Sequence, residues 1–524
     1  MLNTVSLVTL IIFFALCCIA ALYYSRGKIT LSDYFIANNN YKWYTVGFIA
    51  FVTNASTNSL LSFATKTSKI GIAAFNAELT GILSCIVLAL VFGRIYQKNG
   101  FYTTSQYMEA RFNRSVSYIT SFLLIFMAIV ARISAILVAL HLVIHYFFGL
   151  DIYTTSILMI LFCGVYSLVG GQRTIVMTGT MIGFVVLIGT AIFSIIIVTN
   201  FSFESTAYPE HYFKLLRSSS SNDMYSWPGV VFGLPILGIW FHCINQTIVQ
   251  NYLGSKNEQH FQAGALFHGY LKLLIFPMAI LPGILAHEFG ASVEGQLLYP
   301  TLIATFVPEA LKGLVIAAVI GTAMVALSAS FNACSTLFTF DFYKKIYPHA
   351  NDFMTMNIGK IATIFFAVLA MIWMVLMNSF HADVPFVITS CLTYFTPPIV
   401  AAYLLGIFWA RATSKAVFYT MIIGFIIGIV KFVISFNGAE GWKENTLMYA
   451  VAEFNIYNFT VVLFLFSLAL MIGFSYLGEA KELELIKPYL FKYNSPKYDS
   501  LQKRIYFFAA FLIILIIGIY CLFG

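Results

Sequence analysis

The sequence predicts an all-α protein that crosses a membrane about fourteen times. Of its 524 residues, 60% are hydrophobic and only 10% are charged, whereas a soluble domain carries about 25% charged residues. Apolar stretches of roughly 20 residues recur along the whole chain, and each is long enough to cross a hydrocarbon core of about 30 Å as a helix. These observations exclude a soluble protein and predict a multi-pass membrane protein.

Each predicted span is an apolar run bounded by polar or charged residues. The expected spans are 3–24, 45–70, 73–95, 117–148, 153–170, 175–199, 227–252, 263–290, 313–340, 357–378, 384–409, 416–436, 449–477 and 504–523. The first is too long for the apolar part of a signal peptide and is followed by SRGK, so we expect it to be retained as a helix. The longest connections, 200–226 and 478–503, lack the apolar content for a domain of their own.

Basic residues predict the orientation of these spans. They fall on alternate loops, namely 26–28, 94–114, 173, 256, 344–345, 411–415 and 481–504. Positively charged loops stay on the cytoplasmic side, so we expect both termini outside, with the chain in a plasma or inner membrane and its bilayer lipids as partners. The net charge of +8 is spread over many short loops, and we therefore expect no nucleic-acid partner.

Two of the spans are predicted to be broken at corresponding places. Span 45–70 contains the polar stretch 53–59, and five helices later span 227–252 contains Gly233, Pro235 and Gly238. A break exposes backbone groups that only neighbouring helices, water, ions or solute can satisfy at that depth. Paired breaks in two halves are typical of secondary transporters with a midplane site. For either break alone, a structural kink packed by neighbouring helices is an equally good interpretation.

Two opposite charges lie inside otherwise apolar spans. Glu78 stands in AAFNAELTGILSCIVLAL and Lys272 in GALFHGYLKLLIFPMAIL. Moving either side chain into hydrocarbon costs about 2.5–3.5 kcal/mol on insertion scales, so each should face a wet cavity or a partner. The two charges predict a polar solute site inside the helix bundle.

Several segments resemble the sodium/solute symporter family, and within it the sodium/glucose cotransporter branch. They are SDYFIANNNYKWYTVGFIAF (32–51), TTSQYMEARF (103–112), the stretch 245–274, SFNACSTLFTFDFYKKIYP (330–348) and TYFTPPIVAAYLLGIFW (393–409). The last two are the most specific. The resemblance implies a leucine-transporter-type core of two inverted five-helix repeats, 45–199 and 227–409, joined by an extracellular loop, 200–226. It also implies a first helix and inner loop within 1–44 and three C-terminal helices within 410–524.

The resemblance also implies a set of substrate contacts. Glu78 and Lys272 match the family's sugar contacts, Asn54 is retained, and Phe241 falls on the inner aromatic gate. His242 stands where a tryptophan is usual in animal members. Three positions carry smaller side chains than is usual in the family: Ser59 for a histidine or glutamine, Gly238 for a threonine or asparagine, and Thr389 for a glutamine. Since Glu78 can accept and Lys272 can donate a hydrogen bond, we expect a small neutral polyhydroxylated solute, a sugar or polyol.

The resemblance implies a sodium site as well, but several of the family's sodium ligands are missing from this sequence. The family binds sodium with carbonyls that fall here on Val52 and Ala55 and with hydroxyls of the span 313–340. Two of the family's serines in that span are replaced here by Val325 and Ala326. Only Thr322, one turn earlier, can then offer a side-chain oxygen. A family aspartate is replaced by Gly179, and a hard cation needs a near-complete oxygen shell.

Sodium-driven import is therefore the first hypothesis for the function. Proton coupling or facilitated transport by the same fold, another small solute, and a membrane sensor that binds solute without carrying it are the alternatives. We expect no enzyme activity, because no nucleophile–base arrangement or cofactor motif stands out. Sodium, or a proton in the alternative, is the expected coupling ion, and no cofactor is expected.

The remaining polar groups favour structural roles. The eight cysteines show no CxxC spacing, and His141, His145 and His268 have no carboxylate at ligand spacing, so we expect no metal site. Arg132 is interpreted as a tie to a carbonyl or helix end in preference to a part of the gate or ion path. Asp341, with Lys344 and Lys345, is expected to end a helix at the cytoplasmic face.

Overall fold

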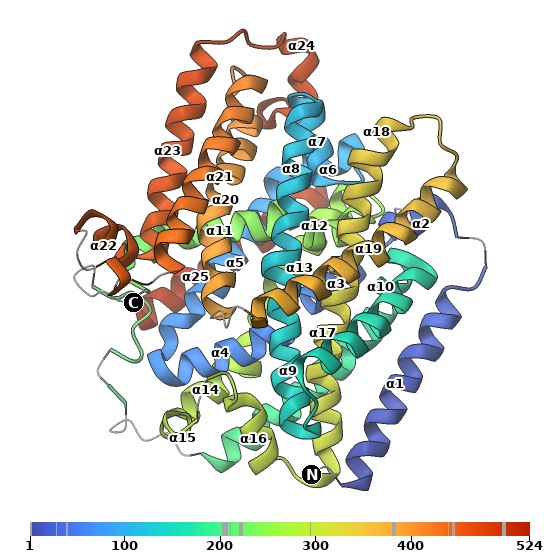
Figure 1. Ribbon diagram of the computed structural model, residues 1–524, viewed down its shortest axis with the longest axis vertical. Helices are drawn as coiled ribbons and strands as arrows, with labels where there is room; N and C mark the ends of the chain where they lie inside the picture. The colour runs from blue at the N-terminus through green and yellow to red at the C-terminus, as the bar shows by residue number, and fades with distance from the viewer. Residues whose placement is uncertain are drawn as a thin grey trace.

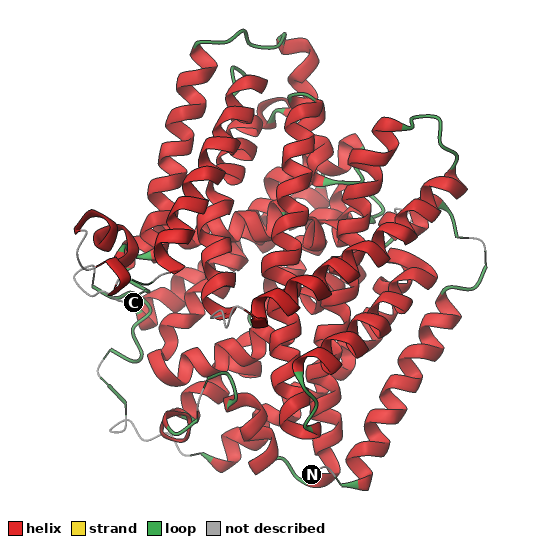
Figure 2. Cartoon of the chain, viewed as in Figure 1, coloured by secondary structure: helices red, strands yellow, loops and turns green. Residues whose placement is uncertain are grey.

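The computed structural model describes residues 3–524 apart from 28, 38–39, 202–207, 210, 219–223, 294, 380–383, 437, 439, 443–445 and 495–498. In this part of the chain the regular elements are all helices and no β-strand occurs (Figure 2). The all-α prediction is confirmed. Parts of the predicted loop 200–226 and of the connection 478–503 lie outside the described residues.

The helices follow one another along the chain, many of them joined by a single π or 3₁₀ turn (Figure 1). The first ten are α1 (Thr4–Tyr24), α2 (Leu31–Ile36), α3 (Trp43–Asn54), α4 (Thr57–Ile70), α5 (Asn76–Val87), α6 (Gly93–Asn99), α7 (Thr104–Arg111), α8 (Arg114–Met127), α9 (Ser134–Phe148) and α10 (Ile152–Asn200). The next eight are α11 (Leu234–Ile239), α12 (Gln246–Leu253), α13 (Glu258–Lys272), α14 (Leu281–Leu285), α15 (His287–Ala291), α16 (Leu298–Phe306), α17 (Glu309–Phe338) and α18 (Lys344–Ile346). The last seven are α19 (Asp352–Ser379), α20 (Val384–Phe408), α21 (Ser414–Phe436), α22 (Thr446–Glu453), α23 (Ile456–Tyr476), α24 (Leu483–Ile486) and α25 (Ser500–Phe523).

The described residues form 11 helices that are long and apolar enough to cross a membrane, or 12 if a bent pair at 229–253 counts as one span. A multi-pass membrane protein is thus confirmed, but the count of about fourteen is not. The predicted spans 153–170 and 175–199 are both present within α10, separated by a kink at Gly171 (φ 57°, ψ −147°). Only glycine suits this bend, because a β-carbon there would also lie 2.3 Å from the Tyr34 carbonyl oxygen.

The predicted inner loops gather at one end of the bundle. In Figure 1 the elements α7, α18 and α24 lie at the top, whereas α15, α16 and the N-terminus lie at the bottom. The basic segments around α7, α18 and α24 therefore share a side. Which side faces the cytoplasm stays a prediction, as does the division into repeats 45–199 and 227–409.

The first predicted break is present and separates two helices of ordinary length. α3 ends at Asn54, Ala55 has a non-helical ψ of 55°, and α4 starts at Thr57. The second predicted break lies further along the sequence than Gly233, Pro235 and Gly238: a π turn, η7 (Trp240–Ile244), is followed by Asn245, whose ψ is 117°. The chain bends there by 45° into α12. Polar residues that can cap a helix, not the glycines and proline upstream, mark both breaks.

Asp341 lies near the end of the continuous helix Glu309–Ile346, as expected, but it also has a structural role inside the protein. It is fully buried and accepts hydrogen bonds from Thr103 (3.0 Å), Ser121 (2.8 Å) and Ser105. The Lys345 ammonium lies 3.9 Å away. The carboxylate thus fastens the start of α7 and α8 to the π turn that follows α17. The isolated helix pattern could not predict this, because all three hydroxyls come from residues more than 200 positions away.

We expect Asp341→Ala to lower the free energy of unfolding by about 2 kcal/mol or more, since it leaves buried hydroxyls without their acceptor, while Lys345 keeps its ion pair with Glu109 at 2.7 Å. Thermal unfolding of the purified protein in detergent measures the change. Asp352→Ala, at the exposed start of α19, is the matched control. Equal unfolding temperatures for the two variants would rule out this role for Asp341.

Candidate functional site

The two intramembrane charges meet at the centre of the molecule. Lys272 Nζ at the end of α13 lies 2.6 Å from Glu78 Oε2 in α5, and their side chains are only 2% and 8% exposed. The same ammonium donates a hydrogen bond of 2.7 Å to Asn54 Oδ1, in the last turn of α3. One cation therefore joins three helices at the first break. Burial of this pair is tolerated because each charge compensates the other.

A glycine makes room for this meeting. A β-carbon at Gly81, one turn after Glu78, would lie 2.6 Å from Lys272 Cε and 3.0 Å from Nζ. The same β-carbon would lie 3.0 Å from His242 Nε2. Any larger side chain would push Lys272 away from Glu78. The close approach of α5 and α13 thus depends on the missing side chain.

The ion pair forms part of the wall of a cavity of about 240 Å³. The cavity also borders four of the other predicted substrate residues: Asn54, Ser59, Phe241 and His242. The rest of the wall is mostly apolar and consists of Phe63, Ala77, Thr80, Gly81, Leu234, Leu237, Gly238, Trp240, Leu392 and Tyr457. An apolar wall with a few convergent polar groups is the usual composition of a small-molecule site.

This cavity shares five wall residues with a smaller one: Trp240, Phe241, Asn54, Ser59 and Leu392. Trp240 and Phe241 line both the 240 Å³ cavity and a second cavity of about 80 Å³. Arg132 lines the second cavity and lies over the Phe241 ring, with its guanidinium carbon 5.2 Å from the ring centre. Phe241 is therefore positioned where an aromatic side chain can divide one compartment from the next.

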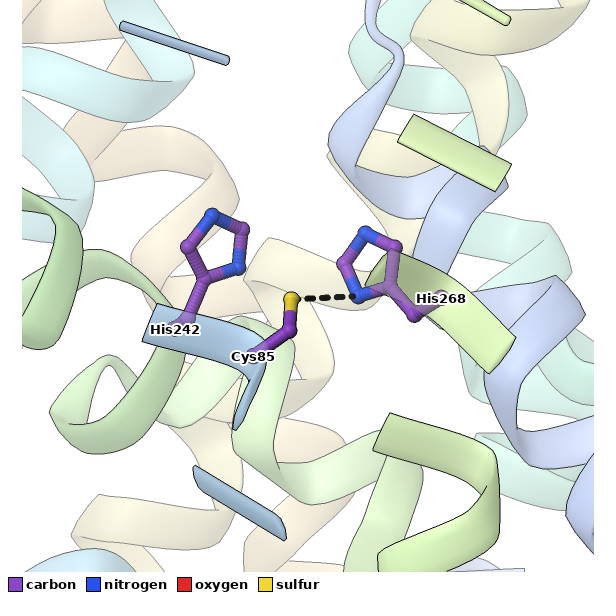
Figure 3. Close-up of side chains that lie close together, drawn as sticks. All are labelled: Cys85, His242 and His268. Carbon is purple, nitrogen blue, oxygen red and sulfur yellow. Dashed lines mark hydrogen bonds between the residues drawn. The ribbon is translucent and has the colours of Figure 1, made fainter. Parts of the chain in front are cut away.

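His242 lies next to Lys272 and also belongs to a buried group of three residues that could in principle bind a metal ion. Figure 3 shows Cys85 from α5, His242 from η7 and His268 from α13 directed toward one another, with ligand atoms within 4.8 Å. The His268 Nδ1 atom lies 2.6 Å from the Tyr252 hydroxyl and 3.8 Å from Cys85 Sγ. Because Lys272 adjoins His242, a metal dication here would face an ammonium. We assign no metal to the group: Cys85 and Tyr252 are each hydrogen-bonded to His268, and His242 lines the cavity beside them.

The residues predicted to bind an ion surround the first break. Val52 and Ala55 flank the end of α3, while the Thr322 hydroxyl lies 2.9 Å from that of Thr57 and donates to the Val319 carbonyl at 2.7 Å. The threonine pair links α4 to α17. The carbonyls at the break and the hydroxyls beside it are the kind of oxygen ligands that a hard cation takes.

The positions that lost polar side chains lie together. A β-carbon at Gly179 would lie 2.4 Å from Ile49 Cδ1 and 3.3 Å from Val325 Cγ1. Gly179 and Val325, which replace an acidic and a hydroxyl side chain in the resemblance, are thus neighbours in one apolar contact. The two substituted positions are therefore in contact, and position 179 has no room for an aspartate side chain.

Sequence reasoning missed two parts of the cavity wall and included one residue that is not in it. Trp240 is buried, borders both cavities, and its indole Nε1 has no hydrogen-bond partner. Its place immediately before the second break was a usable signal. Tyr457 comes from α23, which the resemblance puts outside the core. Thr389 is half-buried in α20 but lines neither cavity; Leu392, one turn later, does.

Gly238 also has a steric reason for its small size. A β-carbon there would lie 2.4 Å from Ser84 Oγ and 3.2 Å from the Thr80 carbonyl oxygen. The helix α11 therefore packs against α5 more closely than a threonine or asparagine would permit. The cavity consequently offers fewer side-chain hydrogen bonds on this wall.

Comparisons with known proteins agree with this arrangement. The model of the sodium:solute symporter family matches residues 34–424. Sodium/glucose cotransporter 1 of Oryctolagus cuniculus is 28% identical over 515 residues, which cover 89% of this chain and 78% of the relative. Sodium/myo-inositol cotransporter 2 of Mus musculus is 27% identical over 451 residues, covering 78% and 67%.

One solved structure has a closely similar fold. It is a Na⁺-coupled sialic acid symporter in its substrate-bound outward-open state, with a TM-score of 0.76 at 20% identity. The alignment covers 92% of this chain and all of that one (100%). This likeness concerns the fold and confirms the predicted transporter architecture.

Proposed function

The chain belongs to the sodium:solute symporter family, and on that premise we propose that it imports a small neutral polyhydroxylated solute, a sugar or polyol, together with sodium. Sodium-coupled solute transport follows from family membership, since the family and the relatives found are transporters and not enzymes. The identity of the solute is the new element. It rests on one observation, the buried Glu78–Lys272 pair in the wall of the 240 Å³ cavity.

Hydroxyl groups suit this pair better than charged groups do. A carboxylate only accepts hydrogen bonds and an ammonium only donates them, whereas a hydroxyl does both. Two neighbouring hydroxyls can therefore engage Glu78 and Lys272 at once. A charged solute would compete for one partner and leave the other uncompensated in a low-dielectric site, which is costly.

The rest of the wall favours a compact solute with an apolar face. Phe241 and Trp240 offer aromatic surfaces, and the indole Nε1 of Trp240 is a donor without a partner. The volume of about 240 Å³ lies just below the usual range of roughly 300–1,000 Å³ for small-molecule sites. A solute of one sugar ring or a similar polyol fits these features.

We infer that Phe241 closes the path on the inner side during transport. It stands between the two cavities, and a change in its rotamer or in the bend at Asn245 would join them. In alternating access one half of the core rocks against the other around a fixed site. The break at Ala55 and the threonine pair Thr57–Thr322 are where sodium would act on this motion.

Uptake into proteoliposomes tests the proposal. Under an inward sodium gradient, at least one radiolabelled sugar or polyol should accumulate above its outside concentration, and collapse of the gradient with a sodium ionophore should abolish the accumulation. A panel of amino acids and carboxylates serves as the comparison. No concentrative uptake of any sugar or polyol would reject the solute assignment. Uptake driven by a proton gradient alone would reject sodium as the coupling ion. Solute binding without any counterflow exchange would indicate a sensor instead of a transporter.

A further inference from the structure

Arg132 carries a fixed positive charge to the first broken helix. It lies in a π turn, η4 (Ala128–Ile133), within the continuous helix Arg114–Phe148. Its Nη2 donates a hydrogen bond of 2.8 Å to the Thr53 carbonyl, and its Nε donates one of 3.3 Å to Ser330 Oγ in α17. The expected tie to a carbonyl is confirmed, but the carbonyl is one at the break.

The position of that carbonyl matters. Because the backbone leaves helical geometry at Ala55, the last carbonyls of α3 lose the donors that a continuous helix would supply four residues later. Arg132 supplies a donor for one of them. Thr53 lies between Val52 and Ala55, the two residues whose carbonyls are expected to hold sodium.

Arg132 thereby joins the same two elements that the ion is expected to join. A sodium ion would connect the end of α3 with α17 through Val52, Ala55 and Thr322. The guanidinium connects α3 with α17 through Thr53 and Ser330. Beside them, Gly179, Val325 and Ile49 form an apolar contact where polar ion ligands would be needed.

The same guanidinium reaches the inner gate. It lies over the face of Phe241, 5.2 Å from the ring centre, at a distance where a cation is attracted to the ring. Phe241 divides the two cavities, and Arg132 lines one of them. One side chain therefore contacts the broken helix, α17 and the aromatic residue that separates the compartments.

We propose that Arg132 is a tethered cation that shares the bridging role of sodium, holding α3, α17 and Phe241 together when the ion site is empty. This inference rests on the proposed sodium-coupled function. Arg132 is a positioning residue: it does not touch the solute cavity's ion pair. Its charge also repels an incoming sodium ion, so sodium binds the native protein weakly and the closed inner gate persists at low sodium.

Removal of the charge should therefore strengthen sodium binding. We expect Arg132→Gln to lower the half-saturating sodium concentration by at least about tenfold, because like charges a few ångströms apart in protein repel by several times thermal energy. Arg132→Lys keeps the charge and should stay within about threefold of the native protein. A merely structural arginine would weaken sodium binding, or leave it unchanged, in both variants.

The measurement is the unfolding temperature of purified protein as sodium replaces choline at constant ionic strength, since a bound ion stabilises by mass action. Arg94→Gln is the matched control: Arg94 also lies over aromatic rings, those of Phe491 and Tyr506, but outside the site. Sodium binding in Arg132→Gln that is no tighter than in the native protein would overturn the proposal. An equal gain in Arg132→Lys would overturn it as well.

A second variant covers a failure of Arg132→Gln to fold. Val325→Ser combined with Ala326→Ser restores two hydroxyls while Arg132 keeps its charge, so sodium affinity should rise by no more than about threefold. A gain of about tenfold or more would contradict the repulsion by Arg132. The sodium-binding measurements contain no solute. They therefore test the role of Arg132 even if no sugar or polyol is taken up, and a negative result for Arg132 does not affect the solute assignment.

Discussion

Lys272→Met alone should lower the free energy of unfolding by about 3–5 kcal/mol, because it leaves the Glu78 carboxylate buried and uncompensated. Glu78→Gln alone should also destabilise, since it leaves the ammonium without its counter-ion. The double variant Glu78→Gln/Lys272→Met removes both charges and should recover most of the lost stability. Solute uptake should be absent in all three. Thermal unfolding and uptake by the same preparations measure the two effects separately.

An exposed ion pair is the matched control. Lys487 and Glu484 lie 2.5 Å apart, but their side chains are 37% and 78% exposed. Lys487→Met should cost less than about 1 kcal/mol, because water screens such pairs. If Lys272→Met proved as mild as Lys487→Met, the Glu78–Lys272 pair would not be the compensated buried pair described here.

Gly81→Ala should lower solute uptake by more than about tenfold while leaving every charge in place. The added β-carbon would lie 2.6 Å from Lys272 Cε, so the ammonium must move away from Glu78 and Asn54. Displacements of this order at a positioned group commonly cost about a hundredfold in function. Alanine favours a helix over glycine by about 1 kcal/mol, so local helix stability does not explain a loss.

Gly164→Ala in α10 is the control for the same substitution, since a β-carbon there would meet no atom within 4 Å. Initial rates of uptake at matched protein amounts give the comparison. Normal uptake by Gly81→Ala would show that the contact between Lys272 and Glu78 is not needed for transport.

Much of the fold could be predicted because the bilayer constrains it strongly. Apolar runs long enough to span the membrane must be helices, which is why α1, α21 and α25 agree closely with their predicted ranges. The charges at 78 and 272 could be paired in advance, since each is too costly to leave in lipid. The first break was visible as the polar run ending at Ser59.

What failed depends on contacts between residues far apart in the sequence. The kink at Gly171 agrees with the predicted boundary between residues 170 and 175, but its close approach to Tyr34 is not contained in any local pattern. Asp341 lies near the predicted helix end, but its buried contacts could not be predicted, because its three hydroxyl partners come from α7, α8 and the turn before α7. Tyr457 enters the cavity from α23, and Thr389 misses it by one helical turn; both depend on how α20 and α23 pack.

Solute binding by the double variant Glu78→Gln/Lys272→Met tests the central claim most directly. Its unfolding should resemble that of the native protein, which separates loss of binding from loss of fold. Titration with the best-transported sugar or polyol should give a dissociation constant raised by at least about a hundredfold, as two charge-assisted hydrogen bonds are lost. A dissociation constant equal to that of the native protein would contradict the assignment of this pair as the solute site.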